Sequence, residues 1–360
     1  MPLCYRQANL NSYPKILELS HSHVSLGDLH GNALKLIYSL IEEGFLHINR
    51  EDYDILKTIY FKPVQELTEK DLSEFKQIIQ KANMSKKRAL TLIGDDLADR
   101  GQNDYFTLLV LQKLQLEGIN LEVLLSNHGV EFIQDYEREQ FSGHYDLGAG
   151  QGESLWNMYY LIRQNLVDEH EIRTIVEQSY RPLIKALNYT VSLPNELTLF
   201  SHAPIGLETV KAIAEKFNLP YLDTHLSDLI KTIEAINSLI QQVLKQNKLA
   251  RLIKAEGSAD LRFPIPLIIP LQRLIWNRAL GNELVTRPAG HFKVRFVHGH
   301  VGPQSILKNG HEVLPDHENL DNLFGKAPEL RKTDSRVEHF SRQSSELTAK
   351  ELDKLWPDRQ

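Results

Sequence analysis

Five short β-rich runs constrain the fold of this chain more than any other feature, because each one ends in a side chain able to bind metal. The runs cover residues 23–28, 89–95, 121–127, 196–202 and 294–300, and their last residues are Asp28, Asp95, Asn127, His202 and His300. Helical periodicity fills the intervals, a pattern that predicts an α/β layered fold. Ligands bind beyond the carboxyl ends of strands in open α/β sheets, so we expect these side chains to meet at one edge.

The spacing of the runs predicts helical insertions. A βαβ unit needs about 30 residues, and the intervals from Asp28 to Asp95 and from His202 to His300 are longer. We therefore predict helical inserts over residues 47–88 and 205–260 within one catalytic domain spanning residues 1–326. Thr68 and Asp71 are spaced as a capping box that opens a helix in the first insert. Residues 327–360 form a charged tail with one short amphipathic helical pattern.

Composition and charge exclude several classes of protein. The 360 residues carry a formal net charge of −6 without a block of Lys and Arg, which disfavours nucleic-acid binding. The single cysteine, Cys4, excludes an internal disulfide framework and a thiolate zinc site. No apolar run is long enough to span a membrane, and no signal peptide opens the sequence. We expect a cytoplasmic protein, or one secreted into a host cell by a route that is independent of a signal peptide.

The ordered motifs resemble those of the calcineurin-like metallophosphoesterases, and within them the phosphoprotein phosphatases. Blocks similar to GD-x-HG, GD-x-x-DRG and GNHE lie at residues 27–31, 94–101 and 126–129, and two isolated histidines, His202 and His300, follow. The resemblance covers residues 23–326 and implies an α-β-β-α sandwich of two mixed sheets flanked by helices. The chain looks like a divergent bacterial branch, similar to effector phosphatases that intracellular bacteria inject into host cells.

The resemblance also implies two divalent metal ions. The first ion would be held by Asp28, His30 and Asp95, and the second by Asp95, Asn127, His202 and His300. Carboxylate, amide and imidazole ligands suit Mn²⁺, with Fe or Zn²⁺ as alternatives. Because two such ions lower the pKa of a shared water and clamp phosphoryl oxygens, the expected nucleophile is a metal-bridging hydroxide.

Four further residues receive roles from the same resemblance. His128 would protonate the leaving oxygen as general acid, and Asp99 would keep its imidazole charged. Arg100 would bind the phosphate through a bidentate fork. A second arginine is expected before the last histidine, and the W-x-R block indicates Arg278. The competing candidates are Arg251, Arg262 and Arg273.

The chain departs from the family pattern in three places. Residues 94–101 contain one residue more than the family block, so Asp95 and Asp96 compete for the bridging role. We choose Asp95, because a loop absorbs an extra residue at lower cost than a strand does. Gly129 stands where the family has Glu, and residues 202–204 read HAP instead of HGG. Substrate specificity therefore does not follow from the resemblance.

These features predict a metal-dependent phosphatase that hydrolyses phosphoserine or phosphothreonine in a protein substrate, which would be a host protein if the chain is an injected effector. A hydrolase of phosphotyrosine, or of small phosphorylated molecules such as diadenosine tetraphosphate, is the enzymatic alternative. A scaffold that binds a phosphoprotein is the non-enzymatic one. The complete ligand set argues against the scaffold, because a catalytically inactive relative would be expected to lose some of these side chains.

Overall fold

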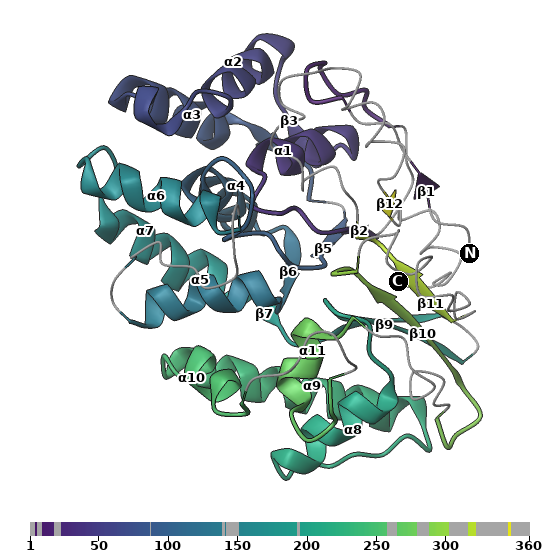
Figure 1. Ribbon diagram of the computed structural model, residues 1–360. Helices are drawn as coiled ribbons and strands as arrows, with labels where there is room; N and C mark the ends of the chain where they lie inside the picture. Colours follow the sequence, from purple (N-terminus) through teal and green to yellow (C-terminus); the bar gives the residue numbers. More distant parts are fainter. Residues whose placement is uncertain are drawn as a thin grey trace.

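The computed structural model describes a defined part of the chain (Figure 1). The described residues are 4–5, 9–17, 23–86, 88–138, 141, 151–192, 195–257, 265–278, 288–301, 316–321 and 345–346. Apart from residues 345–346, the predicted C-terminal tail with its helical pattern lies outside them. Strand β1 (Cys4–Tyr5) pairs antiparallel with β12 (Ser345–Glu346), which brings segments from near the two ends of the chain together.

The first of two four-stranded sheets is parallel. Its strands lie in the order β2-β5-β6-β7 and span His23–Leu26, Ala89–Leu92, Asn120–Leu124 and Ile184–Lys185. Leu26 pairs with Leu92, and Leu92 with Val123, so the carboxyl ends of three strands lie at one edge. The prediction of two mixed sheets is wrong for this sheet, because helical connections return the chain to the same edge and make neighbouring strands parallel.

The second sheet is mixed, as predicted. Its strands lie in the order β11-β10-β9-β8 and span His317–Asn319, Lys293–His298, Glu196–Phe200 and Asn188–Ser192. Strand β10 runs parallel to both β9 and β11, while β8 and β9 form an antiparallel pair. The carboxyl ends of β9, β10 and β11 therefore lie at the same edge of this sheet.

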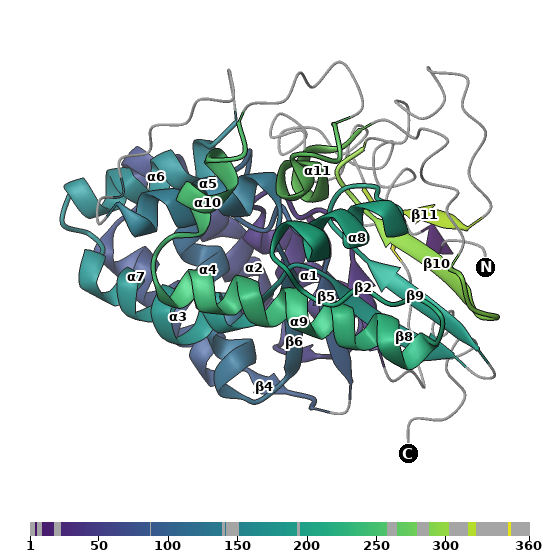
Figure 2. The same ribbon diagram turned by 90° about the horizontal axis from the view of Figure 1, so that it is seen from below.

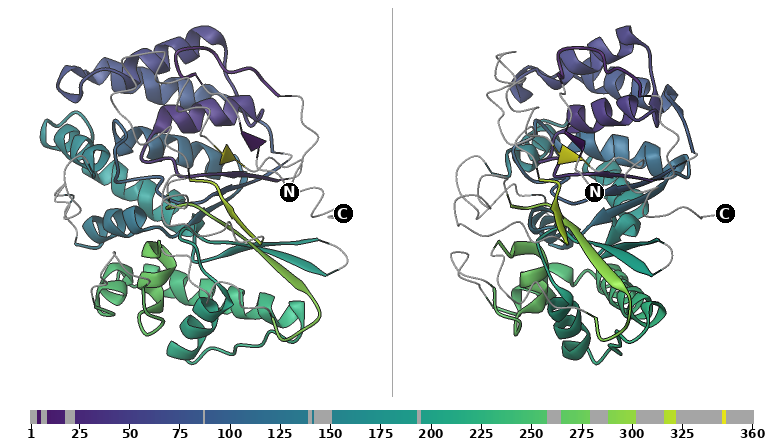
Figure 3. Two further views of the ribbon diagram at one scale, coloured as in Figure 1. Left: turned by 45° about the vertical axis from the view of Figure 1, so that its right-hand side comes forward. Right: turned by 90° about the vertical axis from the view of Figure 1, so that its right-hand side faces the viewer.

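The two sheets pack against each other through buried side chains. A small apolar cluster joins residues near the carboxyl ends of strands from both sheets: Ile93, Leu124, Phe200, Val297 and Leu320. In addition, Asn188 Nδ2 donates to Thr91 Oγ1 across the sheets at 2.8 Å. Figure 3 shows the strands lying between the helices of the N-terminal half and the green helices that follow β9. The predicted mixed α/β architecture is confirmed.

The stretch predicted as the first helical insert contains two helices. These are α2 (Arg50–Tyr60) and α3 (Glu69–Lys81), separated by the 3-10 turn η1 (Val64–Glu66) and framed by the strand pair β3 (Leu46–His47) and β4 (Asn83–Met84). The predicted capping box opens α3. Thr68 Oγ1 accepts a hydrogen bond from Asp71 N at 3.2 Å, and Asp71 Oδ2 accepts one from Thr68 N at 3.0 Å.

The remaining helices divide between the two sheets along the chain. Those connecting strands of the first sheet are α1 (Ala33–Glu42), α4 (Asp104–Leu116), α5 (Asn127–Glu137), α6 (Glu153–Arg163) and α7 (Glu169–Ile175), continued by a π-helical turn η2 (Val176–Tyr180) and a 3-10 turn η3 (Arg181–Leu183). Those after β9 are α8 (Leu207–Lys216), α9 (Leu226–Lys245), α10 (Leu249–Lys254) and α11 (Pro270–Trp276). Among the described helices, none has the length and apolar character that crossing a membrane would require.

A buried asparagine of helix α9 binds the backbone where the chain passes between the two sheets. This long helix runs along the face seen in Figure 2. Asn237 Oδ1 accepts hydrogen bonds from the backbone N–H groups of Ala186 and Leu187 at 2.9 and 3.1 Å, and Asn237 Nδ2 donates to Leu187 O at 2.9 Å. These bonds satisfy the backbone between β7 and β8, where the chain passes from one sheet to the other.

Replacing Asn237 by leucine should destabilise the protein by about 3–5 kcal/mol, because three buried backbone groups lose their partners at about 1–3 kcal/mol each. Urea denaturation of the wild type and the variant measures the difference. Ser238→Ala is the matched control on the same helix, since Ser238 is exposed and should change stability by less than about 0.5 kcal/mol. A loss below about 1 kcal/mol for Asn237→Leu would contradict this role.

Candidate active site

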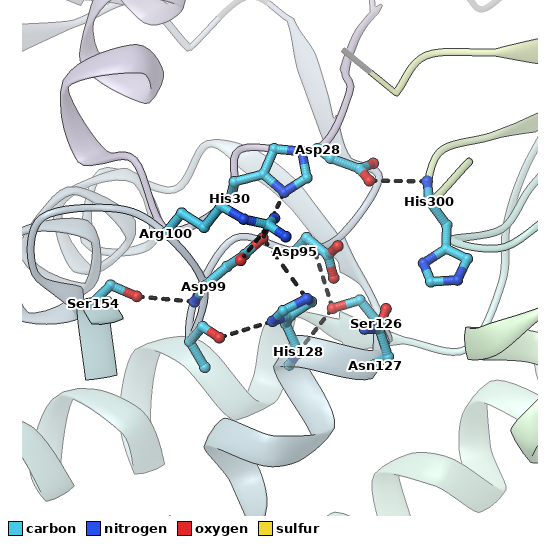
Figure 4. Close-up of polar contacts among 12 residues, drawn as sticks. Asp28, His30, Asp95, Asp99, Arg100, Ser126, Asn127, His128, Ser154 and His300 are labelled. Carbon is cyan, nitrogen blue, oxygen red and sulfur yellow. Dashed lines mark hydrogen bonds and ion pairs between the residues drawn. The ribbon is translucent and has the colours of Figure 1, made fainter. Parts of the chain in front are cut away.

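All six predicted ligand residues come together at the edge where the carboxyl ends of strands from both sheets meet. Figure 4 shows Asp28, His30, Asp95, Asn127 and His300 at this edge. Each is at most 6% exposed, and each follows a strand: Asp28 and His30 after β2, Asp95 after β5, Asn127 after β6, His202 after β9 and His300 after β10. Three groups of side chains offer ligand atoms within 4.8 Å of one another: Asp95 with His202 and His300, His30 with Asp95 and Asp99, and Asp28 with His30 and Asp321. Asp95 belongs to two of these groups.

The backbone is strained at three of these positions. His30, Asp95 and His300 have φ angles of 54°, 49° and 67°, in the left-handed region that side-chain-bearing residues rarely adopt. Such strain clusters at functional sites, where the surrounding structure holds it in place. Gly299 allows a close approach here, because a Cβ at this position would lie 1.9 Å from Asp28 Oδ1.

His202 places its Nε2 atom close to two side-chain oxygens, one of Asn127 and one of Asp95. Its Nδ1 lies 3.0 Å from the carbonyl oxygen of Ile93, which fixes the ring, and burial lowers its pKa. A neutral ring whose Nδ1–H donates to Ile93 presents a lone pair at Nε2, which is 2.8 Å from Asn127 Oδ1 and 3.3 Å from Asp95 Oδ1. A cation held among these atoms would satisfy all three, and imidazole ligands are commonly oriented by a carbonyl in this way.

The donor set fits a divalent metal ion. Asp95 Oδ1 is buried and accepts no hydrogen bond from the described residues. The surrounding ligand atoms are carboxylate oxygens, an amide oxygen and imidazole nitrogens, which suit Mn²⁺, Fe and Zn²⁺. The residues present could therefore hold the metal pair that the motifs predict, although the identity of the ions stays a prediction.

Asp99 has a closer partner than the one expected from the sequence. Its Oδ2 lies 2.6 Å from His30 Nδ1 but 3.7 Å from His128 Nε2, and its Oδ1 lies 3.1 Å from Arg100 Nη1. Burial raises the pKa of this carboxyl, but the charge of His128 and the hydrogen bond from His30 outweigh burial and hold the pKa well below its usual range. The predicted pair with His128 is thus one contact of a carboxylate that also binds His30 and Arg100.

The ring of His128 is oriented from its other side. His128 Nδ1 lies 2.8 Å from the carbonyl oxygen of Ala98, so a proton on Nδ1 is donated there and Nε2 faces the site. The backbone of Asp99 is fixed against the first turn of α6. Asp99 N donates to Ser154 Oγ at 3.0 Å, and Ser154 N donates to Asp99 O at 2.9 Å.

The arginine candidates differ in exposure and in the groups that they contact. Arg100 is partly exposed beside Asp99. Arg278 follows α11, is exposed, and donates from Nε to His300 Nε2 at 3.2 Å. Its competitor Arg273 is buried and occupied by Thr209 Oγ1 and Ile265 O. Arg251 is exposed on α10, and Arg262 lies outside the described residues.

Asp96 belongs to none of the three ligand groups. Its side chain is fully buried near Tyr180, and burial raises its pKa to about 7. A Cβ at Gly129 would lie 3.0 Å from Ser126 Oγ and 3.5 Å from the Tyr180 hydroxyl. Ser126 and Tyr180 therefore crowd the space beside Gly129, where the family has a glutamate.

Asp321 is the site residue that sequence reasoning missed. It is fully buried and its Oδ1 lies 3.4 Å from His30 Nε2. The preceding strand β11 has only three residues, so it does not stand out as a β-rich run. The signal that could have found Asp321 is its place within residues 319–326, a segment that looks like the family's closing strand segment.

Comparisons with known proteins agree with a phosphatase. A family profile described as "WipA-like, phosphatase domain" matches residues 89–326, about two thirds of the chain. One solved structure, the phosphatase domain from the Legionella effector WipB, superposes with a TM-score of 0.68 at 29% identity, covering 78% of this chain and 99% of that one. No curated protein sequence matches. The prediction of a phosphatase is confirmed: the chain belongs to the family of WipA-like phosphatase domains.

Proposed function

We propose that this phosphatase domain is a two-metal phosphomonoesterase of the calcineurin-like, phosphoprotein-phosphatase type, and that it hydrolyses phosphoserine and phosphothreonine in proteins. The observation that carries the proposal is the position of Asp95, which belongs to one ligand group with His202 and His300 and to another with His30. A carboxylate placed in this way can serve two ions at once. A shared carboxylate is what a two-metal phosphate site needs.

The residues that would hold the ions are those predicted from the motifs. Asp28, His30 and Asp95 would hold one ion, and Asp95, Asn127, His202 and His300 the other. Bound ions would supply Lewis-acid activation of water and neutralise the charge of the phosphate. We favour Mn²⁺, with Fe or Zn²⁺ as alternatives, because the ligands are oxygens and imidazoles.

The protein's own side chains would bind the phosphate and move the proton. Arg100 and Arg278 stand beside Asp99 and His300 and would bind the phosphoryl oxygens. His128, with Nδ1 held by the Ala98 carbonyl, would donate the Nε2 proton to the leaving oxygen of the substrate. Asp99, whose carboxyl pKa is lowered, lies 3.7 Å from that Nε2 and would help to orient the ring.

The expected partner is a phosphoprotein. WipB, which resembles this chain, is described as a Legionella effector. We propose by analogy that this chain is also an effector secreted into a host cell and that its substrate is a host phosphoprotein.

The direct test measures steady-state rates on phosphoserine, phosphothreonine and phosphotyrosine peptides and on diadenosine tetraphosphate, each with Mn²⁺, Mg²⁺, Zn²⁺ or a chelator. We expect turnover of the phosphoserine and phosphothreonine peptides with added metal and none with the chelator. Preference for phosphotyrosine or the dinucleotide would overturn the substrate assignment. Full turnover by protein that elemental analysis finds metal-free would overturn the metal dependence, and binding without turnover would indicate a scaffold.

The neighbouring aspartates Asp95 and Asp96 should respond differently to mutation. Asp95→Asn should abolish activity and binding of the metal pair, because this carboxylate lies in two ligand groups. Asp96→Asn is the matched control, since Asp96 belongs to none of the ligand groups, and it should keep the metal stoichiometry and most of the rate. Elemental analysis and kcat measure both. The opposite result would shift the motif alignment by one residue.

Removing the proposed acid should matter most for poor leaving groups. His128→Ala should lower kcat on alkyl phosphates by about 10²–10⁴, the contribution of a general acid. The loss should be much smaller on aryl phosphates, whose leaving oxygen needs less protonation. Metal content should stay at the wild-type value. Equal losses on both substrate types would rule out His128 as the acid.

A further inference from the structure

We propose that Asp321 is a further ligand of the metal pair, placed on the ion that Asp28 and His30 would bind. This inference rests on the proposed two-metal function and extends its ligand set beyond the six residues found from the motifs. Asp321 belongs to a group with Asp28 and His30 whose ligand atoms all lie within 4.8 Å of one another.

The chain around Asp321 is fixed to the edge of the second sheet. Leu320 N donates to the carbonyl oxygen of His298 at 2.7 Å, and Asp321 N donates to the side chain of Asn319 at 2.9 Å. Asn319 Nδ2 in turn donates to Val301 O. These bonds hold Asp321 beside the end of β10, which His300 follows by two residues. Its side chain is therefore presented to the site by ordered backbone.

The orientation of His30 determines what lies opposite Asp321. His30 Nδ1 is 2.6 Å from Asp99 Oδ2, a short contact in which Nδ1–H donates to the carboxylate. In the neutral ring, the lone pair then sits on Nε2, 3.4 Å from Asp321 Oδ1. A lone pair facing a carboxylate oxygen is repulsive unless a cation lies between the two atoms.

The separation of the two atoms suits ligands of a single ion. Two atoms that each lie about 2.1 Å from a metal are about 3.0 Å apart at a right angle and about 3.4 Å apart at the tetrahedral angle. A charged His30 bridging two carboxylates is the alternative. That bridge would bring Nε2 and the oxygen to about 2.7–2.9 Å, which is closer than the 3.4 Å observed.

A third carboxylate changes the character of the site. With Asp28, Asp95 and Asp321 all ionised, a site holding two divalent ions carries one positive charge less than a site with two carboxylates. Oxygen ligands favour Mn²⁺ and Mg²⁺ over softer ions. Asp321 should therefore make the first ion more tightly bound and shift its selectivity toward Mn²⁺.

The decisive experiment reads ligation directly. The full chain carrying Cys4→Ser and Asp321→Cys is stripped of metal, reloaded with Co²⁺ and examined by absorption spectroscopy. A thiolate bound to Co²⁺ gives a near-ultraviolet charge-transfer band, which we expect for this variant but not for Cys4→Ser alone. Asp316→Cys in the Cys4→Ser background is the matched control, because Asp316 is exposed on the same segment. Absence of the band from the folded, Co²⁺-loaded Asp321→Cys variant would overturn the proposal.

Mn²⁺ titration of Asp321→Asn by calorimetry provides a second variant in case the cysteine variant does not fold. We expect one of two Mn²⁺ sites to weaken by about 100-fold or more, the upper range of effects from residues that only orient ligands. Thermal unfolding of the metal-free protein should stay near wild type. Two sites of wild-type affinity would overturn the proposal. Failure of the wild type itself to bind two ions would instead contradict the proposed function.

Discussion

The rest of the structure depends on the electrostatic cost of burying six aspartates close together at one edge of two sheets. The structure meets this cost in different ways. Asp99 is surrounded by His30, His128 and Arg100, and its pKa is lowered. Burial raises the pKa of Asp96 to about 7 and that of Asp104 to about 8, which favours their neutral forms. The other three, Asp28, Asp95 and Asp321, lie in the groups that offer ligand atoms to a cation.

Such crowding is possible only because the loops approach one another with no side chain between them. A Cβ at Gly101 would lie 1.6 Å from the carbonyl oxygen of Gly31, and one at Gly94 would lie 2.7 Å from His202 Nδ1. Gly101 N donates to His30 O at 2.8 Å, which joins the loop after β5 to the loop after β2. The glycines of the motifs thus allow the loops that carry the ligands, which follow separate strands, to come into contact.

The sequence predicted the parts of this site that local pattern determines. Asp28, Asp95, Asn127, His202 and His300 follow apolar β-runs, and parallel pairing within each sheet brings such ends to one edge. Asp321 escaped because β11 is too short to produce a run. The close contact between Asp99 and His30 was not predictable either. It joins side chains from two loops, and no local periodicity encodes their separation.

The carboxylate of Asp99 links the proposed metal ligand His30 to the proposed general acid His128. An ion bound at His30 Nε2 would make the Nδ1–H of that ring a stronger donor to Asp99 Oδ2, only 2.6 Å away. The same oxygen is 3.7 Å from His128 Nε2, so Asp99 Oδ2 interacts with both imidazole rings. One carboxylate therefore contacts both the histidine that would bind an ion and the histidine that would donate the proton. A substitution at Asp99 would disturb the orientation of both rings at once, so the metal site and the proposed acid are not independent parts of this site.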